Sequence, residues 1–279
     1  MTLDPNDPPD QELLRAARGG DRDALEKLVA HHQGQVFRFG MKMCRDPEDA
    51  KDVLQETMLA MARHVGDFRG DSSLSTWLYT IARSFCLKKQ RKQAPDAPRR
   101  LDDADVRDDE SLVDRAKRPD EALAAREIEH ALEHAISELE PMYREVLVLR
   151  DVEGLRAAEV AKVLGVSEQA VKSRLHRARL SVRARIAPLL GTSEPPPAPD
   201  AASCPDVLTL LSQHLEGEIS SDKCAELERH IEACGRCRSA CDSLKRTLAL
   251  CKRSQAEIPE DVQESIRHAV RGWLSSPTA

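Results

Sequence analysis

Apolar positions recur at helical spacing along most of this 279-residue chain. The clearest example lies between residues 167 and 186, where intervals of three and four residues separate Val171, Leu175, Ala178, Val182 and Ile186. Such intervals place side chains on one face of a helix. No segment shows the strict apolar–polar alternation typical of a half-buried strand. The pattern therefore predicts an all-α protein.

Shifts in composition divide this helical pattern into segments. Linkers are indicated where Asp and Pro accumulate. Asp-rich stretches bury too little apolar surface to fold, and Pro-rich stretches remain extended. In order, we expect a helical block at 10–92, a flexible acidic linker at 93–119, a second helical block at 120–190, a Pro-rich tether at 191–203, a small cysteine-rich module at 204–254 and an amphipathic helix at 255–279.

The second block contains the pattern of a helix-turn-helix. A helix predicted from Ala157 to Leu164 ends at Gly165, a residue that tolerates the left-handed conformation of a sharp turn. Ser167 is a suitable N-cap for the following helix, and Ala161 is small enough for the two helices to cross closely. This arrangement favours a DNA-reading element over the alternative, an Arg-rich helix that is merely solvated.

Charge is distributed unevenly enough to make the net value of −6 misleading. Residues 83–100 carry seven Lys or Arg against one acid, and residues 167–186 carry six against one. Between them, residues 102–121 hold nine acids against four bases. Basic side chains on the second helix lie off its apolar stripe, so we expect Lys172, Arg174, Arg177, Arg179, Arg183 and Arg185 to face solvent. Two basic helices suggest two surfaces that contact phosphate.

Longer stretches of the chain resemble a known family. The stretch REVLVLRDVEGLRAAEVAKVLGVSEQAVKSRLHRAR resembles region 4 of extracytoplasmic-function sigma factors of RNA polymerase. The stretches HHQGQVFRFGMKMCRDPEDAKDVLQETMLAM and FRGDSSLSTWLYTIARSFCLKKQRK resemble region 2 of the same family. Both regions occur in the expected order, across residues 10–190.

This resemblance implies a sigma factor whose partners are core RNA polymerase and promoter DNA. Region 2 is expected to bind polymerase through the helix 48–63 and to capture one unpaired strand, since stacking and positive charge hold single strands. For polymerase the candidates are Asp49, Asp52, Gln55 and Glu56. For the minus-10 element they are Trp77, Tyr79, Arg83, Lys88, Lys89 and Arg91. For the minus-35 element they are Ser167, Gln169, Lys172, Ser173, Arg174, His176, Arg177 and Arg179.

A helix-turn-helix repressor or activator with a metal-sensing tail is the alternative interpretation. Such a protein needs no segment like DAKDVLQE or STWLYTIAR. An enzyme is not expected, because the sequence has no Gly-rich phosphate loop, nucleophile elbow or paired-carboxylate pattern.

Six of the eight cysteines fall between Cys204 and Cys251. His230 and Cys234 are four residues apart and share a helix face, and Cys237 follows closely. Three soft ligands at this spacing predict a tetrahedral Zn²⁺ site. Cys204 is favoured as the fourth ligand, because Cys224 lies about 600° around the helix from His230. The metal ligands are therefore expected to be Cys204, His230, Cys234 and Cys237.

The cysteine-rich module, with its HLEGEIS stretch, also resembles the zinc-binding anti-sigma domain. That resemblance implies an intramolecular contact in which the tail masks the sigma regions. Two interpretations of the remaining thiols, Cys224, Cys241 and Cys251, stay open: they are inert, or they sense a metal or an oxidant. Cys44 and Cys86 lie in apolar helices and are expected to be small buried hydrophobes.

The final helix has an apolar face that needs a partner. Docking against a sigma region and packing on the zinc module are both open. No stretch approaches the 18 apolar residues of a membrane span, and the acidic, Pro-rich first ten residues do not resemble a signal peptide. We therefore expect a cytoplasmic protein without a membrane partner.

Overall fold

The computed structural model describes residues 8–44, 46–93, 119–191, 204–253 and 258–275. Within these ranges the chain forms twelve α-helices, one 3₁₀ turn and one π-helical turn, with no strand. The all-α prediction is confirmed. The predicted linker at 93–119 and tether at 191–203 lie almost entirely outside the described residues. Among the described helices, none is long and apolar enough to cross a membrane.

The first bundle contains α1 (Pro8–Arg18), α2 (Arg22–Met43), α3 (Pro47–His64), the 3₁₀ turn η1 (Val65–Asp67) and α4 (Leu74–Gln93). Asp46 caps α3 by accepting a hydrogen bond from the amide of Glu48, and Pro47 occupies the first turn as predicted. At Gly40 a Cβ would lie 3.3 Å from Ala50, so this glycine lets α2 and α3 pack closely.

The second bundle contains α5 (Pro119–Ser137), α6 (Pro141–Leu147), the π-helical turn η2 (Val148–Val152), α7 (Ala157–Leu164) and α8 (Glu168–Ile186). Gly165 has a φ of 68° and ends α7, and Ser167 caps α8 by accepting from the amide of Ala170. The predicted stripe on α8 is buried from Val171 to Ile186. The helix-turn-helix prediction is therefore confirmed at its turn, cap and core.

The cysteine-rich module contains α9 (Val207–Leu215), α10 (Ser221–Ala233) and α11 (Gly235–Arg253). It has a small core of its own, formed by Val207, Leu211, Leu227, Cys241 and Leu244 among others. The last helix, α12 (Glu260–Leu274), buries its apolar face against α2 and α3 of the first bundle.

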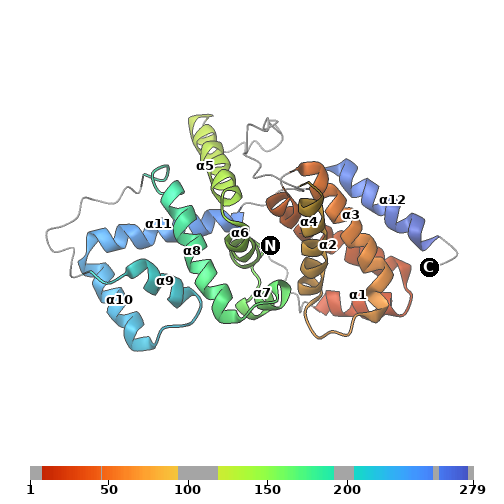
Figure 1. The fold of residues 1–279 in the computed structure, drawn as a ribbon, viewed down its shortest axis with the longest axis horizontal. Helices are drawn as coiled ribbons and strands as arrows, with labels where there is room; N and C mark the ends of the chain where they lie inside the picture. The colour runs from red at the N-terminus through yellow and green to blue at the C-terminus, as the bar shows by residue number, and fades with distance from the viewer. Residues whose placement is uncertain (1–7, 45, 94–118, 192–203, 254–257, 276–279) are drawn as a thin grey trace.

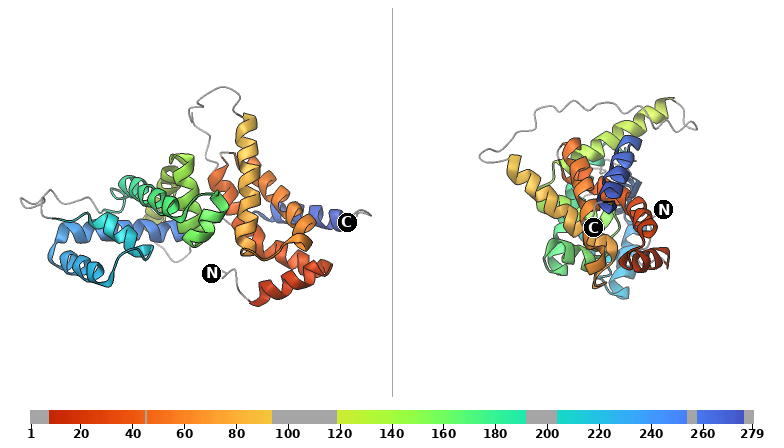
Figure 2. Two further views of the ribbon diagram at one scale, coloured as in Figure 1. Left: turned by 60° about the horizontal axis from the view of Figure 1, so that its bottom comes forward. Right: turned by 90° about the vertical axis from the view of Figure 1, so that its right-hand side faces the viewer.

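The tail spans the length of the molecule. Figure 1 shows α9 and α10 at one end, beside α8, and α12 at the other end, beside α3. Helix α11 contacts α8 and then reaches α5 and η2, and its Cys251 belongs to the same core as the first two bundles. Figure 2 shows the same separation from another direction. The tail therefore contacts both helical bundles.

Candidate nucleic-acid surfaces and metal site

The predicted DNA-reading helix α8 is partly covered. Ser167, Gln169 and Ser173 are exposed near its start, and Arg177 is also exposed. Lys172, Arg174 and His176 are half-buried. Arg179 is only 2% exposed. The part of α8 nearest its N-terminus is thus the most open to a ligand.

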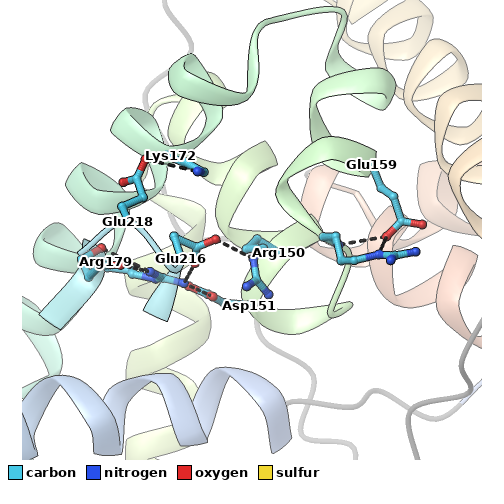
Figure 3. A network of polar contacts seen from close by, with 9 residues as sticks. Arg150, Asp151, Glu159, Lys172, Arg179, Glu216 and Glu218 are labelled. Atoms are coloured by element: carbon cyan, nitrogen blue, oxygen red, sulfur yellow. Dashed lines mark hydrogen bonds and ion pairs between the residues drawn. The ribbon is translucent and has the colours of Figure 1, made fainter. Parts of the chain in front are cut away.

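Two acids between α9 and α10 lie against this helix. Glu216 Oε1 is 2.8 Å from Arg179 Nη2, and Glu216 Oε2 accepts a hydrogen bond of 3.0 Å from Arg150 Nε. Glu218 Oε1 lies 3.2 Å from Lys172 Nζ. Figure 3 shows both carboxylates reaching α8 and η2 from the cysteine-rich module. We call Glu216 and Glu218 the acidic clamp.

Arg179 is also held from within its own bundle. Its guanidinium donates to both carboxylate oxygens of Asp151, at 2.7 and 2.8 Å. Burial by itself lowers the pKa of Arg179, but the hydrogen bonds and charges of Asp151 and Glu216 outweigh it and raise that pKa. The guanidinium therefore stays charged while almost fully buried.

The six basic residues of α8 were expected to lie largely toward solvent, and two of them do not. Arg179 and Arg183 are 2% and 8% exposed. The reason is that α9 and α11 pack on this side of α8, and the carboxylate of Asp151 compensates Arg179 there. Nothing in the α8 repeat itself indicates this burial.

Two of the minus-10 candidates on α4, Tyr79 and Arg83, contact the second bundle. Tyr79 is 1% exposed and its hydroxyl donates to Glu153 Oε2 at 2.8 Å. Arg83 Nε donates to Glu145 Oε1 at 2.7 Å, and Arg83 Nη2 to Glu145 Oε2 at 3.2 Å. Burial and the charge of Glu153 raise the pKa of Tyr79 well above 10.0, so its hydroxyl remains a donor.

The loop before α4 is contacted by the same bundle. Ser73 Oγ donates to Glu159 Oε1 at 3.2 Å, and Lys162 Nζ donates to the carbonyl of Asp71 at 3.1 Å. The ring of Trp77 packs against Phe68, with centroids 5.2 Å apart. This loop therefore lies against α7.

The remaining cations of α4 lie beyond this contact. Lys88 and Arg91 are exposed, and Lys88 Nζ is 5.1 Å from the centroid of the Phe85 ring. Lys89 pairs with Asp52 and, at 3.1 Å, with Asp49. These two pairs join α4 to two of the polymerase candidates.

The polymerase candidates share one helix, α3. Asp52, Gln55 and Glu56 are exposed, whereas Asp49 is half-buried beside Lys89. The buried face of α12 packs on α2 and α3, where Arg271 donates to both carboxylate oxygens of Glu26. The exposed acids of α3 are therefore accessible with α12 in place.

The predicted metal ligands come together. The Sγ atoms of Cys204, Cys234 and Cys237 and a ring nitrogen of His230 all lie within 4.8 Å of one another. Cys204 precedes α9, Cys234 caps the C-terminus of α10, and Cys237 lies in the first turn of α11. Three sulfurs and one imidazole nitrogen around a common point form a donor set suited to a tetrahedral thiophilic ion.

Local contacts differentiate two of these thiols. Hydrogen bonds from the backbone and side chain of Cys237 lower the pKa of Cys234. Burial raises the pKa of Cys237 to about 12. A metal ion would displace the proton from both, because cysteine coordinates as the thiolate.

Other cysteines lie apart from this cluster. Cys241 and Cys251 are fully buried, and Cys224 Sγ lies 3.4 Å from His214 Nδ1 near the acidic clamp. Cys44 and Cys86 are buried as expected, but their Sγ atoms are also only 3.1 Å apart. That proximity has no signal in the sequence, since 41 residues separate them.

Sequence reasoning also missed the acids that form hydrogen bonds and ion pairs with the candidate DNA-binding residues. Glu145, Glu153 and the acidic clamp were not singled out, although Glu216 and Glu218 lie in the HLEGEIS stretch. Acidic residues are common on helical surfaces, so only their contacts with cations of other segments identify them.

Comparison with known proteins identifies three matching families. The family Sigma-70 region 2 matches residues 28–95, and Sigma-70 region 4 matches residues 129–182. A third family, described as "Putative zinc-finger", matches residues 204–238. The first two cover most of the two helical bundles, and the third includes all four clustered metal-ligand candidates.

Individual relatives match about two thirds of the chain. The RNA polymerase sigma-H factor of Pseudomonas aeruginosa is 32% identical over 184 residues, 65% of this chain and 95% of the relative. The ECF RNA polymerase sigma factor SigM of Mycobacterium tuberculosis is 37% identical over 184 residues, 65% and 85% of the respective chains. Among solved structures, CnrH in complex with the cytosolic domain of CnrY is 26% identical, with a TM-score of 0.45, over 63% of this chain and 96% of that one.

Proposed function

The chain belongs to the extracytoplasmic-function sigma factors of the sigma-70 family, and we propose that its cysteine-rich tail holds it in a masked state. As a sigma factor it directs core RNA polymerase to promoters. Both sigma regions match in one chain, so the sigma-factor interpretation replaces the repressor or activator alternative. This role needs no catalytic residue in the chain.

The observation that carries the masking proposal is the acidic clamp. Glu216 and Glu218 form ion pairs with basic side chains of α8 and η2. Without these carboxylates, the same basic side chains would be available to a phosphate backbone. Carboxylates at these positions resemble DNA phosphates in charge and hydrogen-bonding capacity. The clamp and a minus-35 duplex would therefore compete for the same surface.

A second contact masks region 2 in the same way. On α4, two of the minus-10 candidates donate hydrogen bonds to acids of region 4: Arg83 to Glu145 and Tyr79 to Glu153. Release of region 4 would free both surfaces together, because region 4 is held by α4 on one side and by the tail on the other. In the masked state the tail thus contacts region 4, and region 4 in turn contacts region 2.

When released, the basic residues of the two regions would take separate roles. Side chains near the start of α8, Ser167 and Gln169 among them, would meet base edges, and later cations would contact phosphates. On α4, Trp77 and Tyr79 would stack with unpaired bases while Arg83, Lys88 and Arg91 would hold the backbone. The exposed acids of α3 would bind polymerase.

We further propose that Cys204, His230, Cys234 and Cys237 hold Zn²⁺. The ion would supply a structural crosslink that ties the start of α9 to the junction of α10 and α11. In a module of this size such a link contributes much of the folding free energy. The acidic clamp lies between α9 and α10, so its position depends on that crosslink.

A signal would act by binding the masked and released states unequally. Metal ions and oxidants are the two candidate inputs, because both act on thiolates. Since its partner is the cellular RNA polymerase, we expect the protein in the cytoplasm.

Run-off transcription with purified core polymerase tests the proposal. The intact chain is compared with one that ends at Gly191, each with and without Zn²⁺, Cu⁺, Cd²⁺ or peroxide. The truncated chain is expected to transcribe without regulation and the intact zinc-loaded chain to be less active. Equal activity of the two chains under every condition would overturn masking, and failure of both to associate with polymerase would overturn the sigma role.

A further inference from the structure

Two buried thiols meet in the first bundle, far from the zinc cluster. Cys44 ends α2 as its C-cap, and Cys86 lies in the third quarter of α4. Their exposed fractions are 7% and 1%, and their Sγ atoms are 3.1 Å apart, so they share an S–H···S hydrogen bond. Neither residue is among the metal-ligand candidates, and neither is a candidate for promoter or polymerase binding.

From this geometry we infer that Cys44 and Cys86 form a reversible disulfide when the protein meets hydrogen peroxide. One thiol loses two electrons to the peroxide, giving a sulfenic acid and one water. The second thiol then attacks the sulfenic sulfur, so that an S–S bond forms, the S–O bond breaks and a second water leaves. A dithiol reductant reverses the reaction by thiol–disulfide exchange.

The positions of the two residues allow this bond with little movement. The sulfurs must approach from 3.1 Å to about 2.05 Å, which small side-chain rotations provide. Cys44 follows the last turn of α2, where its amide donates to the carbonyl of Gly40. A residue at a helix end is freer to adjust than one in the middle of a helix.

The reaction is expected to be slow in the folded protein. The hydrogen bond with Cys44 and burial both raise the pKa of Cys86, so little thiolate forms at neutral pH. Local opening at the end of α2 would admit the oxidant. The disulfide should therefore accumulate over minutes to hours of exposure.

The bond would tie α4 to α2 just beyond the contact with region 4. Arg83, one turn before Cys86, holds Glu145, and the basic residues Lys88, Lys89 and Arg91 follow Cys86 on the same helix. Closing a loop of 41 residues between the cysteines restricts the unfolded chain and stabilises the bundle. Oxidation would thus stiffen the part of region 2 that carries the minus-10 candidates.

Peptide mapping of the full-length, zinc-loaded protein tests the inference. The protein is treated with hydrogen peroxide, unfolded, alkylated and digested without reduction. A crosslinked peptide joining Cys44 to Cys86 is expected, and it should disappear after dithiothreitol. Recovery of both cysteines in the alkylated form, or their oxidation without a crosslink, would overturn the inference.

Cys251 provides a matched control within the same sample. It is also fully buried, with burial raising its pKa to about 12, and it has no sulfur partner in the described part of the chain. It should remain alkylatable while the pair crosslinks. In a second measurement the oxidised protein should unfold at a temperature several degrees higher than the reduced one, and Cys44→Ser should abolish that shift. An unchanged unfolding temperature in a sample shown to be crosslinked would contradict the stiffening of region 2.

Discussion

The carboxylate of Glu216 lies 2.8 Å from the guanidinium of Arg179, and the two side chains are only 4% and 2% exposed. The pair joins the cysteine-rich module to the helix expected to read DNA. Removing one partner of a buried pair costs more than the pair contributes, because the other charge stays desolvated. The contact is therefore a sensitive point for shifting the masked and released states.

Glu216→Gln is expected to release region 4. The substitution keeps the shape of the side chain but removes the charge that Arg179 and Arg150 share. A lost charge-assisted hydrogen bond costs about 1.5–3 kcal/mol, which corresponds to about a tenfold or greater shift toward the released state. Run-off transcription at limiting polymerase should rise accordingly, since the DNA-contacting residues are unchanged.

Glu226→Gln is the matched control for this substitution, because Glu226 is an exposed acid of the same module. It should leave transcription unchanged. Equal stimulation by both variants would mean that net charge, not the acidic clamp, controls activity.

Glu145→Gln should loosen the contact between region 4 and region 2. Arg83 keeps its own charge for promoter binding but loses a bidentate carboxylate that is 7% exposed. A double-mutant cycle of Arg83 and Glu145, measured as unfolding free energy, should give a coupling of about 1–3 kcal/mol. A coupling near zero would show that the two bundles do not interact through this pair in solution.

Cys234→Ser should remove bound zinc and with it much of the tail's helical content. One of three thiolates is lost, and a three-ligand site cannot hold the module as tightly. Zinc content by atomic absorption and helicity by circular dichroism measure the two effects. Cys224→Ser is the control: it lies outside the four-ligand cluster and should retain one zinc per chain.

Ile266→Ala should detach α12 from the first bundle. Ile266 is 2% exposed at the contact with α2 and α3, and loss of a buried Ile side chain costs about 2–5 kcal/mol. Amide exchange across residues 258–275 should accelerate strongly. Arg271→Ala removes only a solvent-exposed ion pair and should have a small effect. If the two variants exchange alike, apolar burial does not hold this helix.

The contact between α8 and α9 should weaken in acid. His176 Nε2 lies 3.1 Å from Thr209 Oγ1, and burial lowers the pKa of His176 from 6.5, an effect that the nearby Arg179 and Arg177 reinforce and Asp206 opposes. The masked state therefore favours the neutral imidazole. Neutral His176 contributes fully to the stability of the masked state above pH 6.5, and this contribution is lost as the pH falls below that value.

Amide exchange in α9, corrected for the intrinsic pH dependence, measures this effect. Protection should fall between pH 7 and pH 5.5 in the wild-type protein and should be less dependent on pH in His176→Asn. A wild-type profile without any change in this range would exclude His176 as the titrating group.

Features that depend on neighbouring residues could be predicted from the sequence. The turn at Gly165, the cap at Ser167 and the buried stripe of α8 follow from local propensity and helical spacing. The grouping of His230, Cys234 and Cys237 has the same origin, because their spacing places them close together once a helix forms there. Cys204, favoured from the sequence as the fourth ligand, lies beside that group in the structure although it is distant along the chain.

Only the tertiary structure decided which charges meet. Arg179 follows Ala178 at the edge of the apolar stripe, so its position on the helix is predictable, but its burial depends on α9, α11 and Asp151, which come from other parts of the chain. The pairs of Glu216 with Arg179, Glu145 with Arg83 and Cys44 with Cys86 are likewise formed between distant segments. Local spacing determines the face on which a side chain lies; how the helices pack together determines what that face contacts.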